Sequence, residues 1–375
     1  METRVDRHGQ EYQAYTGEGR EYLPRLDYLL TERTWFADVN DPYLYPSGWA
    51  DDWGQLNPGH AALGRVLEVA VTDDPSDSRA VLITEQLVVE LLDTLRPDGN
   101  IVPAAMRESV AKIVATYVTE LNQNVFATVP GSTGPWALDD SYVYDHEAEL
   151  RAANRTHLRM LLEDLGRDEA AQEVVRMAQL DYVWQQYEHH LTRPLEHESD
   201  LDRRLSDMIN ETRTTAEVLC ALDRGLIEDT RLTMEEKVER LATRRAHEAL
   251  LIDLVGMIPH PAARAGALAA AIVTAGDTSV EDLQAQHDVD LEKIIESLQD
   301  KTRALAEQMF QEAIVQFAPI DLPPELLDPA TGELIPTPEW GRTEQQAWKK
   351  FLESDAGAEV RDAITEAGEK FSIYA

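Results

Sequence analysis

The stretch that decides the fold of this 375-residue chain lies between residues 103 and 191. Its first part, residues 103–126, reads PAAMRESVAKIVATYVTELNQNVF. Pro103 suits a first helical position, where its missing N–H costs nothing. The apolar side chains that follow recur every three or four residues: Met106, Val110, Ile113, Tyr117 and Leu121. This spacing predicts one helix over about 103–126, with these side chains on a single face.

The second part, residues 156–191, reads THLRMLLEDLGRDEAAQEVVRMAQLDYVWQQYEHHL and predicts two more helices joined by a tight turn. Gly166 is expected to end the first of them in a left-handed conformation, and Asp168 to cap the next. Between the two parts, the run PGSTGP at 130–135 cannot continue a helix and predicts a loop. Short turns between helices favour antiparallel neighbours, so the stretch predicts a helical hairpin with a third partner.

The rest of the chain carries the same helical spacing. Helices are predicted at about 60–71, 78–95, 196–227, 290–317, 343–354 and 358–371. No strand pattern and no internal repeat is visible, and residues 1–20 have the polar composition of a loose arm.

We therefore predict an all-α fold in three parts. Residues 1–74 form an irregular N-terminal segment rich in aromatic residues, and residues 75–317 form a large multi-helix array. Residues 318–375 hold a Pro-rich stretch, expected to be an extended linker or strap, and the C-terminal helices.

Charge excludes some classes of function. The chain has 34 Lys and Arg against 70 Asp and Glu, a net charge of −36. Nucleic acid and anionic membranes both favour a cationic surface, so we predict no nucleic-acid partner and disfavour a membrane partner. An acidic surface by itself indicates solubility more often than a specific basic partner.

Cysteine content and the N-terminus bear on the compartment. The single cysteine, Cys220, cannot form an intramolecular disulfide and is predicted to be a small core residue. The N-terminus lacks the apolar stretch of a cleaved signal peptide. We predict a cytoplasmic protein, or one exported without a cleaved signal peptide.

No motif for catalysis, cofactor binding or metal binding is present, so we assign no catalytic, cofactor or metal residues. Phosphate loops, a Gly-x-Ser-x-Gly elbow and His-Glu-x-x-His are all missing, and so is the Glu-x-x-His of di-metal bundles. The best metal candidate is the patch of Glu188, His189 and His190 with Glu196 and His197. Adjacent histidines on a helix point about 100° apart, so they chelate one ion poorly. Seventy carboxylates give many chance pairs, so no acid–base pair can be chosen.

Aromatic residues in irregular segments are the candidates for partner binding. They lie in a strip at 35–59 that Pro and Gly interrupt and in the loop at 130–145, and four are assigned this role: Trp49, Trp53, Trp136 and Tyr142. Packing of these rings on the chain's own helices is the favoured alternative. The most apolar window, 250–275, favours two short buried helices over a membrane-inserting hairpin.

Three stretches carry a resemblance to a known group of proteins. They are the helix at 104–121 ending VATYVTE, the run LRMLLEDLGRD at 158–168 continuing to MAQLDY at 177–182, and AEVLCALDRG at 216–225 followed by a charged helix. Over about 75–317 the chain resembles a poorly characterised all-helical module of actinobacterial proteins. That module accompanies type VII (ESX, WXG-type) secretion systems and polymorphic toxins, and the resemblance implies no catalytic residues.

Three functions stay open at this level. The leading hypothesis is a non-catalytic interaction or scaffold protein with a protein partner, associated with a bacterial secretion or toxin system. The second is a toxin or effector that acts at membranes through 250–275. The third is an enzyme with an unrecognised carboxylate or histidine site.

Overall fold

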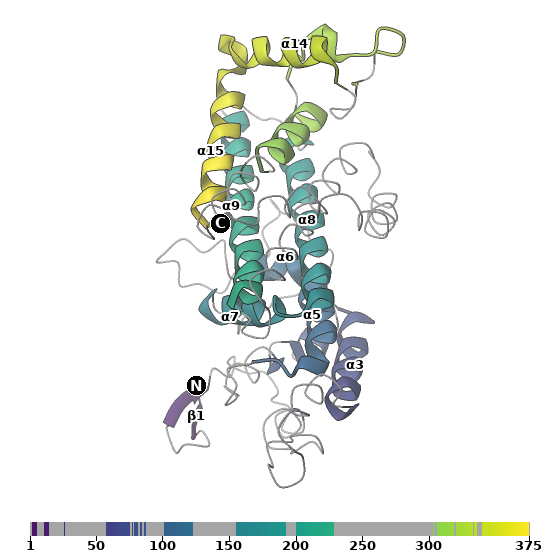
Figure 1. Ribbon diagram of the computed structural model, residues 1–375, viewed down its shortest axis with the longest axis vertical. Helices are drawn as coiled ribbons and strands as arrows, with labels where there is room; N and C mark the ends of the chain where they lie inside the picture. The colour runs from purple at the N-terminus through teal and green to yellow at the C-terminus, as the bar shows by residue number, and fades with distance from the viewer. Residues whose placement is uncertain are drawn as a thin grey trace, which may run out of the picture. The chain divides into compact units, whose positions relative to one another are not determined.

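The computed structural model of this chain shows an all-α protein (Figure 1). It describes residues 2–5, 11–14, 26, 58–75, 77, 79–81, 83–84, 86–87, 101–122, 155–192, 200–228, 303, 306–318, 320–332, 334–335 and 340–374. The chain forms two compact units. Unit 1 comprises 1–182 and 218–229, and unit 2 comprises 183–217 and 230–375. Two long helices, α8 (Glu169–Thr192) and α9 (Asp200–Glu228), contribute to both units.

A short hairpin at the N-terminus departs from the prediction of a chain without strands. Strand β1 (Glu2–Val5) pairs antiparallel with β2 (Glu11–Ala14), with Glu2 opposite Ala14 and Val5 opposite Glu11. The loose-arm prediction is therefore wrong for these residues. Strands of four residues are too short to show a reliable alternating pattern, so pairing between them is not visible in the sequence.

Unit 1 contains the helices predicted around residue 103, but in pieces. They are η2 (Ala104–Met106), α5 (Arg107–Thr116) and α6 (Val118–Leu121), and α3 (Pro58–Thr72) packs against the first two. The single helix predicted there is interrupted at Tyr117, whose backbone leaves the helical region at φ −105° and ψ 25°. Its fully buried hydroxyl donates to the carbonyl of Pro75 at 2.9 Å. The described residues within 79–87 are also helical.

The tight turn between α7 (Arg155–Leu165) and α8 confirms one prediction and corrects another. Asp168 caps α8, because its Oδ1 accepts from the backbone N–H of Ala171 at 2.9 Å. Gly166, however, does not adopt a left-handed conformation; among described glycines only Gly332 has a positive φ. A Cβ added at Gly166 would lie 2.0 Å from the carbonyl oxygen of Leu222 on α9. Glycine is needed here for a close approach of backbones.

Helix α9 has one buried face whose residues recur every three or four positions, as helical spacing requires. This buried face includes Leu205, Met208, Thr212, Ala216, Leu219 and Leu226. Cys220 is only half-buried, so its prediction as a core residue is wrong. It follows Leu219 by one position, which turns it about 100° away from that buried residue.

Unit 2 is built on the second half of α8 and the first part of α9, with the described helical residues 303 and 306–317. Trp184 packs edge-on against Phe317 and Tyr187 against Phe310, each with ring centroids 5.7 Å apart. The hydroxyl of Tyr187 also forms a hydrogen bond with the hydroxyl of Thr212. These side chains join three helical segments in one aromatic core.

The C-terminal part of unit 2 contains η4 (Pro324–Leu326), α14 (Arg342–Leu352), η6 (Asp355–Gly357) and α15 (Ala358–Tyr374). Helices α14 and α15 match the two helices predicted at 343–354 and 358–371 to within three residues at each end.

The Pro-rich stretch before α14 is folded, so the prediction of an extended strap is wrong for its described residues. Leu327 and Leu334 form an isolated antiparallel bridge, which reverses the chain. The indole N–H of Trp340 then donates to the carbonyl of Ile335 at 2.8 Å. Proline prevents regular structure but permits a compact turn held by other residues.

Candidate functional site

The structure leaves the four assigned partner-binding residues untested. Trp49, Trp53, Trp136 and Tyr142 lie outside the described residues, and so does the apolar window 250–275. Their roles stay predictions.

Only part of the candidate metal patch lies within the described residues, so it stays untested. His190 is completely buried and His189 half-buried, with ring centroids 6.0 Å apart, while His197 lies outside the described residues. No group of three or more His, Cys, Asp or Glu within the described ranges is arranged to hold a metal ion.

Buried polar residues along α8 are a feature that the sequence reading missed. In unit 1, Arg176 forms an ion pair with Asp223, at 2.9 Å, and Gln179 exchanges two hydrogen bonds with Asn122, at 2.8 and 3.1 Å. All four side chains are more than 90% buried. Because each interaction stays within the unit, these groups specify how its helices pair and offer no open ligand site.

Asp164 is a buried carboxylate of unit 1 with several hydrogen-bond donors around it. Its Oδ2 accepts from the backbone N–H groups of Ile101 and Val102, at 3.1 and 2.6 Å. Its Oδ1 accepts from Arg107 at 2.9 Å. The carboxylate thereby fixes the backbone that enters η2 and neutralises a buried arginine. The chain supplies all these contacts, so Asp164 is a structural residue.

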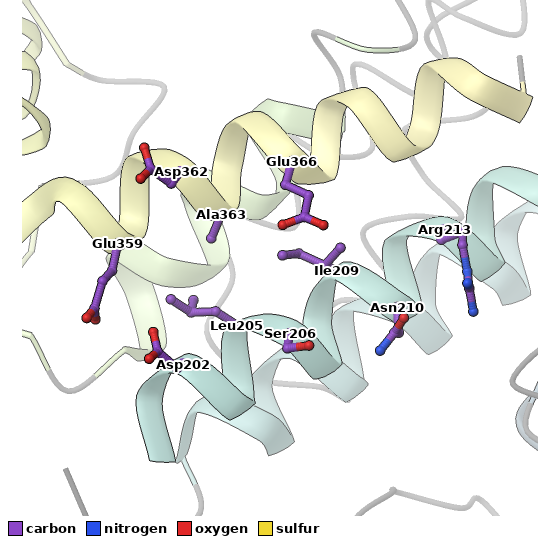
Figure 2. Close-up of a pocket in the computed structure, with 10 residues that line it drawn as sticks. All are labelled: Asp202, Leu205, Ser206, Ile209, Asn210, Arg213, Glu359, Asp362, Ala363 and Glu366. Carbon is purple, nitrogen blue, oxygen red and sulfur yellow. The ribbon is translucent and has the colours of Figure 1, made fainter. Parts of the chain in front are cut away.

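A cleft between α9 and α15 is the strongest candidate site (Figure 2). It has a volume of about 480 Å³, within the range of known ligand sites. Ten described residues line it: Asp202, Leu205, Ser206, Ile209, Asn210, Arg213, Glu359, Asp362, Ala363 and Glu366. Three of them are buried and form an apolar floor: Leu205, Ile209 and Ala363. The polar lining residues surround this floor.

Helical spacing explains how these side chains come to share one cleft. On α9, Asp202, Ser206, Asn210 and Arg213 follow one another at steps of four, four and three residues. On α15, Glu359 and Glu366 are seven residues apart. Both spacings return to the same face of a helix, so each helix presents one row of polar groups to the other.

The charges in the cleft differ in how they are neutralised. Asp362 pairs with the neighbouring Arg361 at 2.9 Å. Asp202 and Glu359 pair with no cation that the structure describes. Arg213 makes no ion pair with a described carboxylate, and its Nε is buried without a hydrogen-bond acceptor. In Figure 2, Asp202 and Glu359 extend from facing helices at one end of the cleft, and Arg213 lies at the other.

The lining groups suit binding better than covalent or metal chemistry. They supply carboxylates, one guanidinium, one hydroxyl and one amide above an apolar floor. No histidine, cysteine, lysine or tyrosine is among the ten described lining residues, so Ser206 has no histidine base beside it there. Hydrogen bonding, ion pairing and apolar contact are the interactions that this set provides.

Sequence reasoning missed this site for a clear reason. Periodicity places these α9 residues on one face of a helix, and nothing in the sequence pairs that face with α15.

Comparison of this chain with protein-family models, curated proteins and solved structures found no match. The cleft is therefore interpreted from its own chemistry. Within the described ranges, no helix has both the length and the apolar character that crossing a membrane requires.

Proposed function

We propose that this protein is a non-catalytic helical interaction protein that binds a partner protein through the α9–α15 cleft. The observation that supports this proposal is an open cleft with an apolar floor and, at both ends, charged groups that form no ion pair with a residue the structure describes. Charged groups without partners give specificity when a complementary surface covers them, and an apolar floor gives affinity.

The setting of this interaction is part of the proposal. The resemblance of 104–121, 158–182 and 216–225 to a secretion-associated module favours a partner from a bacterial type VII secretion or toxin system. A cytoplasmic location, or export without a cleaved signal peptide, fits that setting. No observation in the described residues favours membrane insertion or catalysis, so no second function is proposed.

Affinity capture with a blocked cleft tests the proposal. The tagged full-length protein is expressed in its native cells as wild type, as Ser206→Trp and as Gln346→Trp. Ser206 is exposed and lines the cleft, so a tryptophan there fills it without entering the core. Gln346 is an exposed residue of α14 outside the cleft and serves as the matched control.

We expect one protein to elute stoichiometrically with wild type and Gln346→Trp and to be lost with Ser206→Trp. Mixing the purified pair and measuring the mass of the intact complex then confirms direct binding. Equal recovery with all three proteins would show that the partner binds elsewhere. A wild-type protein that elutes alone as a monomer would overturn the interaction hypothesis.

A further inference from the structure

The geometry of the cleft also indicates the chemistry of its guest. We infer that the guest is a short extended segment of the partner, with a Lys or Arg side chain at one end and a carboxylate about five residues away. This inference rests on the proposed function, because it assumes that the α9–α15 cleft is the binding site.

The length of the guest follows from the helix that forms one wall. Asp202 and Arg213 are separated by 11 residues of α9. At about 1.5 Å per residue this separation is about 16 Å along the helix axis. An extended chain advances about 3.3 Å per residue, so five residue steps match the distance between the two charged ends.

The cationic end follows from the cost of covering carboxylates. Asp202 and Glu359 are exposed in the unbound protein, where water solvates both. A guest that fills the cleft removes part of this water, and a covered carboxylate without a cation is strongly unfavourable. Because the structure describes no cation paired with either group, the guest must supply one.

The acidic end rests on a separate observation, the state of Arg213. In a chain with 70 Asp and Glu, this half-buried arginine pairs with no carboxylate that the structure describes. Its Nε is already shielded from water and has no acceptor. A guest carboxylate there gains two parallel hydrogen bonds to a guanidinium whose desolvation has partly occurred. An acidic cluster alone would select only a cation, whereas the cleft selects both charges at a fixed separation.

The floor sets the residues between the two ends. Leu205, Ile209 and Ala363 are each more than 90% buried and lie between the charged ends (Figure 2). In an extended segment, alternate side chains point to one side. Residues five steps apart in such a segment point to opposite sides, so the basic side chain of the guest faces α15 with Glu359 and its carboxylate faces α9 with Arg213. Apolar residues of the guest between these two ends lie over the floor.

Peptide libraries with fixed charges test this inference on the full-length protein. The probes are three fluorescein-labelled hexapeptide libraries with blocked termini: Lys-Xaa4-Asp, Asp-Xaa4-Asp and Lys-Xaa4-Lys, with Xaa drawn from Ala, Leu, Val and Ser. Binding is measured by fluorescence anisotropy at 50 and 300 mM NaCl. We expect Lys-Xaa4-Asp to bind most tightly, and more weakly at the higher salt because partly exposed ion pairs are screened.

Charge-neutralising variants locate the two ends. Partly exposed ion pairs contribute up to about fivefold in affinity each. We therefore expect about three- to fivefold weaker binding of Lys-Xaa4-Asp for Arg213→Gln and a larger loss for Asp202→Asn with Glu359→Gln. The control, Glu325→Gln with Glu353→Gln, removes two exposed carboxylates outside the cleft and should bind as wild type does. Replacing Asp by Asn in the peptide should weaken its binding to the wild-type protein but not its binding to Arg213→Gln.

The outcomes separate this inference from the proposed function. Tightest binding of Asp-Xaa4-Asp or Lys-Xaa4-Lys, equal binding of all three libraries, or no binding would overturn the inferred guest. So would unchanged affinity in both cleft variants. The capture experiment with Ser206→Trp decides independently whether the cleft binds a partner at all.

Discussion

Gly225→Ala should be strongly destabilising. Among the described glycines inside helices, we expect alanine to cost the most stability at this position. Gly225 lies on α9 where that helix crosses the end of α7. A Cβ built there would be 1.7 Å from the carbonyl oxygen of Glu163 and 2.7 Å from its carbonyl carbon. Both atoms belong to the backbone, so no side-chain rotation can relieve the overlap. Gly166 faces the backbone of Leu222 in the same crossing, at 2.0 Å.

The magnitude follows from the movement that relieves the overlap. Real Cβ atoms approach other heavy atoms no closer than 3.0 Å, so the two helices must separate by at least about 1.3 Å. Overpacking of this kind costs about 1–3 kcal/mol, and a rigid backbone obstacle favours the upper end. Replacing glycine by alanine in a helix interior returns about 1 kcal/mol. We expect a net loss of about 2 kcal/mol, which lowers the folded-to-unfolded ratio about 30-fold.

The free energy of unfolding is measured by urea unfolding followed by circular dichroism. Hydrogen exchange of peptides from α7 and from residues 218–228 shows whether the loss of stability is located at the crossing. Gly64→Ala is the control, because a Cβ there lies 3.1 Å from the side chain of Ser109 and its cost is offset by helix propensity. Gly225→Ala with Gly166→Ala should cost less than the sum of the single changes, since one separation relieves both overlaps. A Gly225→Ala protein as stable as Gly64→Ala would refute the close crossing.

Three further predictions concern buried polar groups of unit 1. Asp164→Asn should cost about 3 kcal/mol by urea unfolding, since it leaves the buried charge of Arg107 uncompensated; adding Arg107→Met should restore part of the loss, and a greater loss in the double variant would contradict this explanation. Burial raises the pKa of Tyr117 from 10.0 to about 12, so its contribution to stability is complete below pH 10 and is lost as the pH rises toward 12. The free energy of unfolding, measured with urea at pH 9 and at pH 11.5, should fall between these two pH values by about 2 kcal/mol less in Tyr117→Phe than in wild type. An equal fall in both proteins would exclude Tyr117 as the cause. Gln179→Leu should cost about 2 kcal/mol, because the buried Oδ1 of Asn122 loses the hydrogen bond that Gln179 donates. Adding Asn122→Leu should cost little more, and strictly additive losses would show that the two amides are energetically independent.

Helices of the central stretch could be predicted closely because the relevant interactions are local. The predicted helices around Leu158 and Val175 correspond to α7 and α8, and the predicted cap Asp168 caps α8. Periodicity and capping depend on residues three or four positions apart. The all-α class follows from the same local patterns repeated along the chain.

Local patterns failed where a distant part of the chain decided the conformation. Gly166 suggested a left-handed cap, but its missing side chain instead makes room for the backbone of Leu222. The Pro-rich stretch suggested an extended strap, but the bridge between Leu327 and Leu334 folds it. A glycine or proline limits the possible conformations, and packing against other residues selects among them.

The sequence by itself determined that the protein is helical, acidic and without a known catalytic or metal-binding motif. Only the tertiary structure decided which polar residues become buried pairs and which line a cleft. Asp202 and Glu359 are far apart in the chain and meet because α9 and α15 present matching faces in unit 2. Helical periodicity fixes the face on which a residue lies, whereas the partner of that face depends on contacts distant in sequence, which periodicity does not encode.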